Sequence, residues 1–440
     1  MKDHAQRVIR TCKYSWLFPL TGFVLTFVVG LGLSLSNQDI RVDVQRIGLI
    51  VFATLTGIGS CYTIQAFRYF TIYRTRACFY HVVGGLLFNL FLTWMTLIGV
   101  NALYTLYHPL DLITTHLIEE FKPFVSYPSK LPVWIDTDPA CGEGETDDVD
   151  DCWALIGALR SPELDIRGIS TVFGNTKVEK GFQIAHQALI RFGSLNSSRL
   201  PPPIFEGSSS PGNPHWKRSQ ASEALATALR KEKLTLVAQG PLTNIATVLV
   251  NHPDIVGNIE RIIMIGGKHP GDLFHPGKQW WFHFRDFNIC KDTPATRIVL
   301  YSGVPLILIP FELATHLVIT RSDLKRLELG DEAAKWLCQV SEPWLSFWEN
   351  KLHKEGFHPF DVLAIGYLIR PDMFTCKISP ARIGFSIFLE PWGMGRDLEV
   401  APYIRGPQVY YCFDLNPQFK EIFIRRLLDN PPGGFPPDFR

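Results

Sequence analysis

Leu131-Pro132-Val133-Trp134-Ile135 is a short apolar run, and Asp136-Thr137-Asp138-Pro139 follows it at once. An apolar run of this length that stops at polar residues predicts a buried strand. The acids continue in Asp147-Asp148-Val149-Asp150-Asp151, before the apolar start of a predicted helix at Cys152. Carboxylates crowded at the end of a strand repel one another unless a cation lies among them, and hard oxygen ligands suit Ca²⁺ or Mg²⁺. A solvated acidic loop is the alternative, but the position between a strand and a helix favours a metal site.

Strands and helices alternate through the rest of the chain. Buried parallel strands are predicted at Thr235 to Ala238, Arg261 to Ile265 and Val304 to Ile309. Helices are predicted at Ser219 to Lys231 and Thr293 to Tyr301, the second capped by Thr293. This alternation predicts an α/β fold with a mostly parallel central sheet and flanking helices, in which ligands bind at the carboxyl ends of the strands.

Glycines follow several of these strands at equivalent places, at Gly174, Gly240 and Gly266-Gly267. A lone glycine after a strand is usually only a turn, but their recurrence beside polar residues favours one shared site. The chain has no Gly-x-Gly-x-x-Gly sequence and no P-loop, which argues against a dinucleotide cofactor or an NTPase. No Cys-x-x-Cys pair occurs either, so a zinc site is not expected.

Five blocks of sequence, taken in order, resemble those of the calcium-dependent, inosine–uridine-preferring nucleoside hydrolases. They are Asp136-Thr137-Asp138-Pro139 with Asp150-Asp151-Cys152-Trp153-Ala154-Leu155, then Val172 to Thr176, Ala238 to Ala246, Ile265-Gly266-Gly267 with Asp286 to Ile289, and Pro359 to Ala364. The ordered set is far more specific than any single block. The resemblance covers residues 131 to 430 and says nothing about the first 110.

The resemblance implies a nucleoside hydrolase-like, Rossmann-like domain that cleaves the N-glycosidic bond of ribonucleosides to ribose and free base. It implies a Ca²⁺-bound water as the nucleophile, with Asp136 as both a metal ligand and the general base. The remaining protein ligands would be Asp151, the Thr243 carbonyl and Asp361. Ribose would be bound by Asp150, Asn175, Asp286 and Asn288.

Simpler roles are open to most of these residues. Asparagine and aspartate commonly cap helices, so this role is open to Asn175, Asn244 and Asp361. Asp286 and Asn288 could be ordinary polar residues of a loop. Asp147 and Asp148 compete with the following pair of acids for the paired-acid role, and the spacing to the Ala-Leu of the first block favours the later pair.

The chain also departs from the family pattern. Phe360 stands where many members have a histidine, the candidate acid for the leaving base. His358 could replace it, but a surface or structural role is the simpler interpretation of that histidine. The loop between Pro139 and Asp150 is longer than the compact family loop. Four aromatic residues precede Asp286 and could stack on a base, pack on the domain or touch a membrane surface: Trp280, Trp281, Phe282 and Phe284.

The first 110 residues differ in composition. Three nearly uncharged runs, at about 15–36, 47–67 and 79–105, are each apolar enough to span a bilayer. A cleaved signal peptide would explain only the first. We therefore expect a three-helix membrane anchor over 1–110, a linker over 111–130 and a catalytic domain over 131–440.

Basic residues favour the cytoplasmic side for the N-terminus and for the loop between the second and third spans, which holds Arg68, Arg74 and Arg76. Three crossings would place the catalytic domain on the non-cytoplasmic side, where cysteine pairing is open but cannot be deduced. A net charge of +1 gives no case for nucleic acid, and a homo-oligomer remains open. The alternative to an enzyme is a catalytically inactive nucleoside- or sugar-binding membrane sensor.

Overall fold

The computed structural model describes residues 130–142, 144, 147–195, 201–212, 215–270, 272, 285–386 and 395–428. All of them belong to the second of the two units into which the chain divides, Ile118–Arg440. The predicted membrane spans, the linker and the aromatic run at 280–284 lie outside the described residues. Within the described part, no helix has both the length and the hydropathy needed to cross a bilayer.

The described residues form a nine-stranded sheet with the strand order β10-β9-β11-β6-β5-β4-β1-β2-β3. Its strands are β1 (Leu131–Thr137), β2 (Leu164–Thr171), β3 (Ile204–Glu206), β4 (Leu234–Ala238), β5 (Ile259–Ile265), β6 (Leu306–Ile309), β9 (Phe374–Ser386), β10 (Gly395–Val400) and β11 (Gln408–Leu415). Only β9 runs against its neighbours, while the other pairings are parallel. The mostly parallel sheet expected from the sequence is confirmed. A small separate sheet pairs β7 (Ile319–Thr320) with β8 (Gly356–Phe357).

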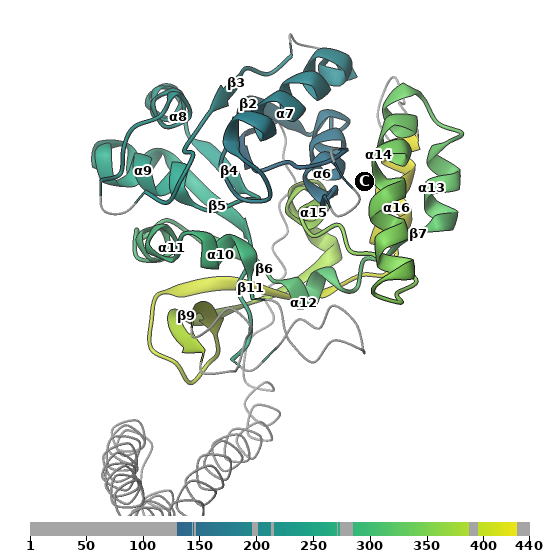
Figure 1. Cartoon of the computed structure of the whole chain (residues 1–440). Helices are drawn as coiled ribbons and strands as arrows, with labels where there is room; N and C mark the ends of the chain where they lie inside the picture. The colour runs from purple at the N-terminus through teal and green to yellow at the C-terminus, as the bar shows by residue number, and fades with distance from the viewer. Residues whose placement is uncertain are drawn as a thin grey trace, which may run out of the picture. The chain divides into compact units, whose positions relative to one another are not determined.

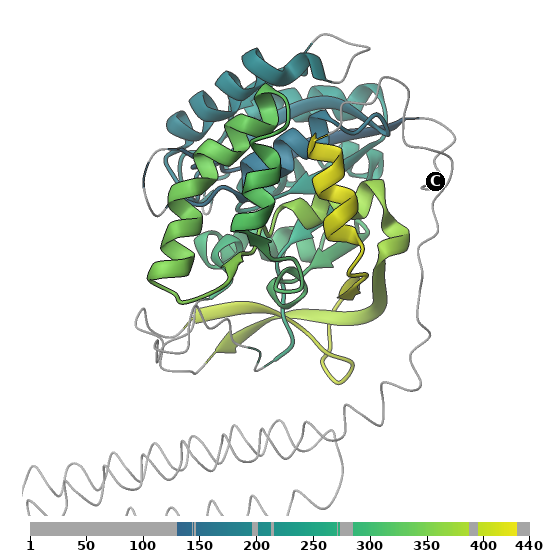
Figure 2. The same ribbon diagram turned by 90° about the vertical axis from the view of Figure 1, so that its right-hand side faces the viewer.

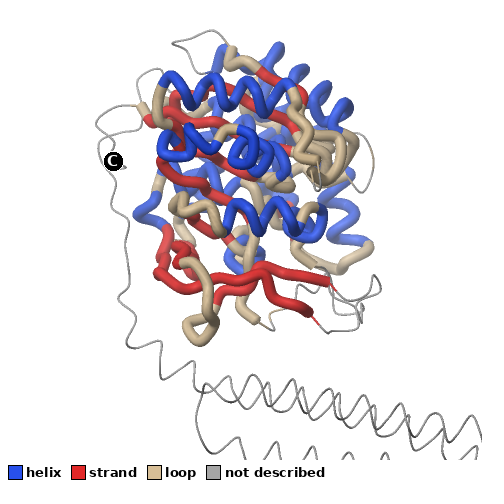
Figure 3. The backbone as a smooth tube through the Cα atoms, turned by 90° about the vertical axis from the view of Figure 1, so that its left-hand side faces the viewer, coloured by secondary structure: helices blue, strands red, loops and turns tan. Residues whose placement is uncertain are grey.

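Helices cover both faces of the large sheet, as Figures 1 and 3 show. The longer ones are α6 (Asp150–Leu159), α7 (Val178–Phe192), α8 (Gln220–Lys231), α9 (Thr243–Asn251), α11 (Thr293–Leu300), α13 (Arg321–Leu327), α14 (Glu332–Asn350), α15 (Val362–Ile369) and α16 (Phe419–Leu428), and the shorter ones are α10 (Phe287–Lys291) and α12 (Phe311–Ala314). One core lies beneath α8, α9 and α11. The other lies beneath α6, α7, α13, α14, α15 and α16, the face turned toward the viewer in Figure 2.

The sequence explains how β1 serves both cores. Val133 and Ile135 point into one core and Trp134 into the other, because side chains alternate across a strand. All three are almost fully buried, as expected for a strand in the interior of a parallel sheet. The sheet order places β1 between β2 and β4, so the residues at its carboxyl end have neighbours on both sides.

Two further predictions concern helix starts. The helix predicted from Ser219 begins at Gln220 as α8, and Ser219 caps it through a reciprocal bond with Ser222. The cap of α11 is Asp292, whose carboxylate accepts from the Ala295 amide at 3.1 Å. The prediction that Thr293 caps this helix is therefore wrong by one residue, because the Asp292 carboxylate accepts the hydrogen bond from the free Ala295 amide.

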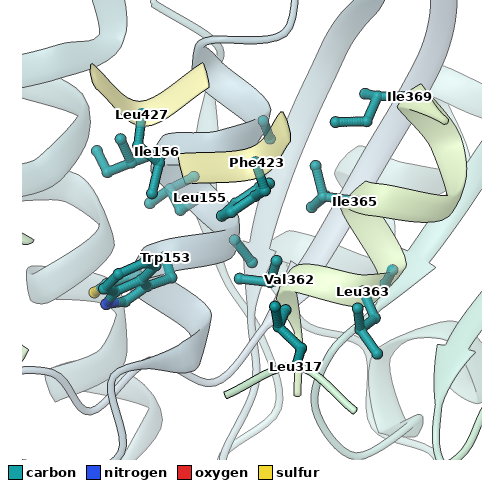
Figure 4. Close-up of a cluster of buried hydrophobic side chains, with 14 of the residues drawn as sticks. Trp153, Leu155, Ile156, Leu317, Val362, Leu363, Ile365, Ile369, Phe423 and Leu427 are labelled. Atoms are coloured by element: carbon teal, nitrogen blue, oxygen red, sulfur yellow. The ribbon is translucent and has the colours of Figure 1, made fainter. Parts of the chain in front are cut away.

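A close contact among α6, α15 and α16 fixes the geometry of the site. Figure 4 shows Ile156 of α6, Ile365 of α15 and Phe423 of α16 directed into one apolar cluster. Gly157 lets α16 approach, since a Cβ there would lie 2.7 Å from the Phe423 ring. Each buried side chain of this size stabilises the fold by about 1.5–3 kcal/mol. The cluster therefore holds the first turns of α6 and α15 in fixed positions.

Candidate active site

Carboxylates from three segments meet at the carboxyl ends of the parallel strands. Asp150 and Asp151 open α6 and Asp361 immediately precedes α15, and their nearest oxygens lie within 4.8 Å of one another in buried positions. The packing of α6 on α15 explains the approach. Helix N-termini are favourable places for negative charge, which offsets part of the repulsion. Together with Asp138 and Asp148, these residues are called the acid cluster below.

The acid cluster fits a divalent cation. Burial raises the pKa of Asp138, Asp150 and Asp361 well above the ordinary value, and the neighbouring carboxylates raise the pKa of each further. Burial also raises the pKa of Asp148, to about 7. Carboxyl groups in this arrangement must either bind protons or share a cation, and their hard oxygens suit Mg²⁺ or Ca²⁺.

Asp138 belongs to this cluster and retains a free oxygen. Its Oδ2 accepts a hydrogen bond from the Asn175 amide at 2.8 Å. Its Oδ1 is buried and has no hydrogen-bond partner among the described residues. A Cβ at Gly174 would lie 1.8 Å from Oδ2, and one at Gly240 would lie 2.8 Å from Oδ1. These glycines, at the ends of β2 and β4, therefore make room for the Asp138 carboxylate.

Asp136, two residues earlier, lies in different surroundings. Its Oδ1 accepts hydrogen bonds from Ser170 Oγ at 2.5 Å and Asn244 Nδ2 at 2.8 Å. Burial raises its pKa to about 7, and no carboxylate is among the main causes of the shift. Its Oδ2 is buried without a partner among the described residues. Neither Asp136 nor Asp138 is one of the three mutually close carboxylates of Asp150, Asp151 and Asp361.

Two asparagines join the strands instead of capping helices. Asn244 donates to Asp136 and to the Thr171 carbonyl at 2.9 Å, and it accepts from the Ser208 amide. Asn175 donates from Nδ2 to Asp151 Oδ2 at 3.2 Å. Asp151 Oδ1 in turn accepts from Thr137 Oγ1 and from the Asp138 amide. These bonds orient Asp151 toward the end of β1.

The residues predicted to bind ribose lie on the neighbouring strand ends. Asp286 caps α10 and accepts from the Ile289 amide at 3.2 Å and the Gly267 amide at 2.9 Å. The Gly266–Gly267 turn needs positive φ values of 145° and 89°, which disfavour other residues. Asn288 donates to the Gln239 carbonyl at 2.8 Å, and the Gln239 side chain donates to the Asp361 carbonyl at 3.1 Å. This chain of bonds connects Asp286 and Asn288 to the acid cluster.

Thr243 begins α9, just after the turn that follows β4. Its hydroxyl donates to Asp292 Oδ2 at 2.7 Å. Its carbonyl accepts from Thr247 Oγ1 at 2.7 Å.

A disulfide joins the loop after β1 to the first turn of α6. It links Cys141 to Cys152, the residue directly after Asp151. A second disulfide links Cys376 to Cys412 on the paired strands β9 and β11, away from the acid cluster. The sequence did not determine this pairing.

Sequence reasoning passed over Asp138, Ser170 and Gln239. Asp138 directly follows the last residue of β1, where ligands of parallel sheets bind, but the predicted strand ended at Ile135 and so pointed to Asp136 instead. Ser170 and Gln239 lie at the ends of strands that flank β1. Their roles depend on the strand order, which the local sequence does not specify.

Comparison with known proteins gives a consistent result. The sequence profile of the inosine-uridine preferring nucleoside hydrolases matches residues 133–395. The non-specific ribonucleoside hydrolase RihC of Klebsiella pneumoniae is 30% identical over 269 residues, 56% of this chain and 82% of the relative. That of Escherichia fergusonii is 28% identical over 274 residues, with the same coverage.

Solved structures establish the fold. A plant nucleoside hydrolase, PpNRh1, superimposes with a TM-score of 0.56 at 20% identity, covering 68% of this chain and 99% of its own. A purine-preferring ribonucleoside hydrolase from Gardnerella vaginalis gives a TM-score of 0.52 at 21% identity, with 67% and 98% coverage.

The expected α/β fold of the catalytic domain and its membership of the nucleoside hydrolase family are thereby confirmed. The profile covers more than half of the chain, and its blocks bring together the residues of the acid cluster. Nucleoside hydrolases of this family are metal-dependent, and the buried acid cluster can hold a divalent ion. The chain belongs to the inosine-uridine preferring nucleoside hydrolase family, whose members hydrolyse the N-glycosidic bond of ribonucleosides.

Proposed function

We propose that this protein is a membrane-anchored, calcium-dependent hydrolase that splits ribonucleosides into ribose and free base. The observation that carries the proposal is the meeting of Asp150, Asp151 and Asp361 within 4.8 Å, beside the free oxygen of Asp138. A silent binding domain would not need a buried cluster of carboxylates that destabilise one another. The enzyme is therefore favoured over the inactive sensor.

Asp138, Asp151, Asp361 and the Thr243 carbonyl would hold the cation. Ca²⁺ takes six to eight oxygen ligands with flexible geometry, so these four protein groups would leave room for water and ribose hydroxyls. When bound, the cation neutralises the acid cluster and lowers the pKa of an attacking water. The sequence placed Asp136 in the shell, but the geometry favours Asp138, because its pKa responds to Asp151 and because its Oδ1 is free.

The reaction then follows from what the side chains can do. Asp138 Oδ1 accepts the proton of the attacking water, the role that the sequence gave to Asp136. Asp136 positions Ser170 and Asn244, which join β2 and α9 to the end of β1. The ribose hydroxyls would be held by the predicted set of Asp150, Asn175, Asp286 and Asn288. A sugar fixed in this way can pass through the oxocarbenium-like transition state that glycosidic cleavage requires.

Ribose release by the full chain tests the activity and the metal together. We expect purified full-length protein to release free ribose from a panel of purine and pyrimidine ribonucleosides. A Ca²⁺-selective chelator should abolish release, and added Ca²⁺ should restore it more fully than added Mg²⁺. Ribose release that persists after complete chelation would overturn the metal part of the proposal. Absence of release from every nucleoside would overturn the activity.

The anchor and its orientation belong to the same proposal. The three apolar runs of the first 110 residues support a membrane anchor. The two disulfides support a domain that faces an oxidising compartment. Protease added to intact cells should therefore cut the catalytic domain and spare the basic N-terminal head. Protection of the whole domain would contradict the orientation.

A further inference from the structure

A cavity of about 630 Å³ lies beyond the carboxyl end of β6, the strand that pairs with β5. It is bounded by α12, α14 and the segment that leads from β8 to Asp361. Lining residues include Asp272, Phe311, Glu312, Trp348 and His358. This volume is typical of a small-molecule site, and the aromatic walls suit a flat heterocycle. The proposed metal chemistry uses none of these residues.

Glu312 is one of the acidic residues of this wall, with Asp272 and Glu355. Its Oε1 accepts a hydrogen bond from the Tyr411 hydroxyl. Its Oε2 is buried and has no hydrogen-bond partner among the described residues. Burial raises the pKa of Glu312 to about 8, and the charges of Asp272 and Asp286 raise this pKa further by smaller amounts. Hydrogen bonds from backbone amides lower the pKa but do not offset burial. The carboxyl group therefore carries a proton at neutral pH.

Glu312 lies at a strand end that neighbours the predicted ribose-binding residues. Glu312 begins α12 just after β6, and the Gly266–Gly267 turn follows the adjacent strand β5. Asp286, bonded to the Gly267 amide, is close enough to influence the Glu312 pKa. Asp286 is in turn two residues from Asn288, which is linked through Gln239 to Asp361. Ribose held near Asp286 would place its base on the Glu312 side, away from the acid cluster.

We propose that Glu312 protonates the departing base from the wall of this cavity. The inference rests on the proposed hydrolase activity and supplies the proton donor that Phe360 cannot provide. In the reaction, the bond from the anomeric carbon to the base nitrogen breaks and its electron pair stays with the base. The Glu312 proton passes to that base. A water oxygen bonds to the anomeric carbon, and the water proton goes to Asp138. Solvent then returns a proton to Glu312 and removes one from Asp138.

His358 also lines the wall, and its geometry does not suit proton donation to the base. Its Nδ1 lies 3.1 Å from the Leu317 carbonyl, and a carbonyl can only accept, so Nδ1 carries the ring proton. Burial lowers the pKa of His358, so the ring stays neutral and Nε2 has no proton to give. The ring packs edge-on against Trp348. His358 is therefore suited to shaping the wall or to accepting a hydrogen bond from the base.

Glu312→Gln separates proton donation from structure, because the amide can still bond to Tyr411. The full-length variant would be assayed with inosine and with 4-nitrophenyl β-D-ribofuranoside, whose phenolate leaves without a proton. We expect the inosine rate to fall by about 10²–10⁴-fold, the usual contribution of a general acid, and the nitrophenyl rate to stay within a few-fold. The nitrophenyl activity also reports that the variant is folded.

Two controls and a pH profile complete the test. Glu312→Asp, which retains an acid, should recover part of the inosine rate. Tyr411→Phe removes the hydrogen bond but keeps the acid, so it should not reproduce the loss. Inosine hydrolysis by the unaltered chain should fall as pH rises through about 8, and nitrophenyl riboside hydrolysis should not show this limb. The ionisable groups that face Glu312 or share its cavity are Asp272, Asp286, Lys354, Glu355, His358 and Tyr411.

Equal loss of both activities in Glu312→Gln would assign Glu312 a structural role and overturn the inference. Unchanged inosine hydrolysis would overturn it as well. Hydrolysis of the nitrophenyl riboside but not of inosine by the unaltered chain would retain the glycosidase chemistry and refute Glu312 as a working donor. Hydrolysis of neither substrate would overturn the proposed function, and this inference with it.

Discussion

Asp136 and Asp138 lie two residues apart on one segment, yet the structure gives them different surroundings. Asp136 is inside the sheet, where it accepts hydrogen bonds from Ser170 and Asn244. Asp138 lies past the end of β1, among carboxylates and between two glycines. Burial is the main cause of the raised pKa of both, but only Asp138 owes part of its shift to neighbouring acids.

The difference shows that the surroundings of each aspartate in such a motif depend on where the strand ends. A carboxylate within the strand is surrounded by neighbouring strands and can tie them together. A carboxylate beyond the strand lies at the edge where ligands bind in parallel sheets. The comparison therefore supports the proposed positioning role of Asp136 and chemical role of Asp138, and three experiments can break or sharpen it.

The largest effect is expected from Asp138→Asn. An amide cannot accept the water proton, so kcat/KM for a nucleoside should fall by at least about 10²-fold. Calcium binding, measured by calorimetry, should weaken too. The metal-free protein should become more stable to heat, because one charge leaves a repulsive cluster. Near-normal turnover by this variant would return the base role to Asp136.

An intermediate effect is expected at the disulfide beside the acid cluster. Replacing Cys141 and Cys152 by serine opens an 11-residue separation and should cost about 3 kcal/mol of unfolding free energy. Because Cys152 adjoins Asp151, calcium affinity should also fall, by about tenfold. Denaturant unfolding and calorimetry measure the two effects.

The matched control is the other disulfide. Replacing Cys376 and Cys412 opens a separation of 36 residues, so the stability cost should be slightly larger, about 4 kcal/mol. Calcium affinity should stay unchanged, because β9 and β11 lie away from the cluster. If both double variants weaken calcium binding equally, the first disulfide has no special role at the site.

The smallest effect on catalysis is expected from Asp136→Asn. The amide oxygen can still accept from Ser170 and Asn244, so activity should fall by no more than about tenfold, as for hydrogen bonds weakened by about 1 kcal/mol. Stability should fall by about 1–2 kcal/mol, because the new amide hydrogens face the place where Asp136 Oδ2 has no partner. A thermal melt and a ribose assay give both values. A loss as large as that of Asp138→Asn would remove the distinction between the two aspartates.

The sheet was largely predictable because its strands are continuous apolar runs. The predicted strands agree with β4 and β5 to within two residues at each end, for Thr235 to Ala238 and Arg261 to Ile265. The agreement is good because buried parallel strands leave little room for polar residues. The start of α11 was missed by one residue, because Asp292 and Thr293 can both cap a helix. Local sequence does not decide between adjacent caps.

The sequence blocks that form the site were predictable, but the role of each residue within the site was not. Asp151 and Asp361 were identified by block resemblance, and packing of α6 on α15 brings them together. The choice between Asp136 and Asp138 depends on which residues β2 and β4 place alongside β1. Glu312 follows a strand without any accompanying motif, so only the cavity and Tyr411 identify it.

The position of β11 has a consequence for the biosynthesis of this protein. This strand comes near the end of the chain, yet it lies between β6 and β9 and joins them into one sheet. A nascent chain that has emerged only as far as residue 395, where the family profile ends, would leave the edges of β6 and β9 unpaired. Exposed strand edges invite association with other chains. A premature stop in this short tail would therefore be expected to yield aggregates and not a shortened enzyme.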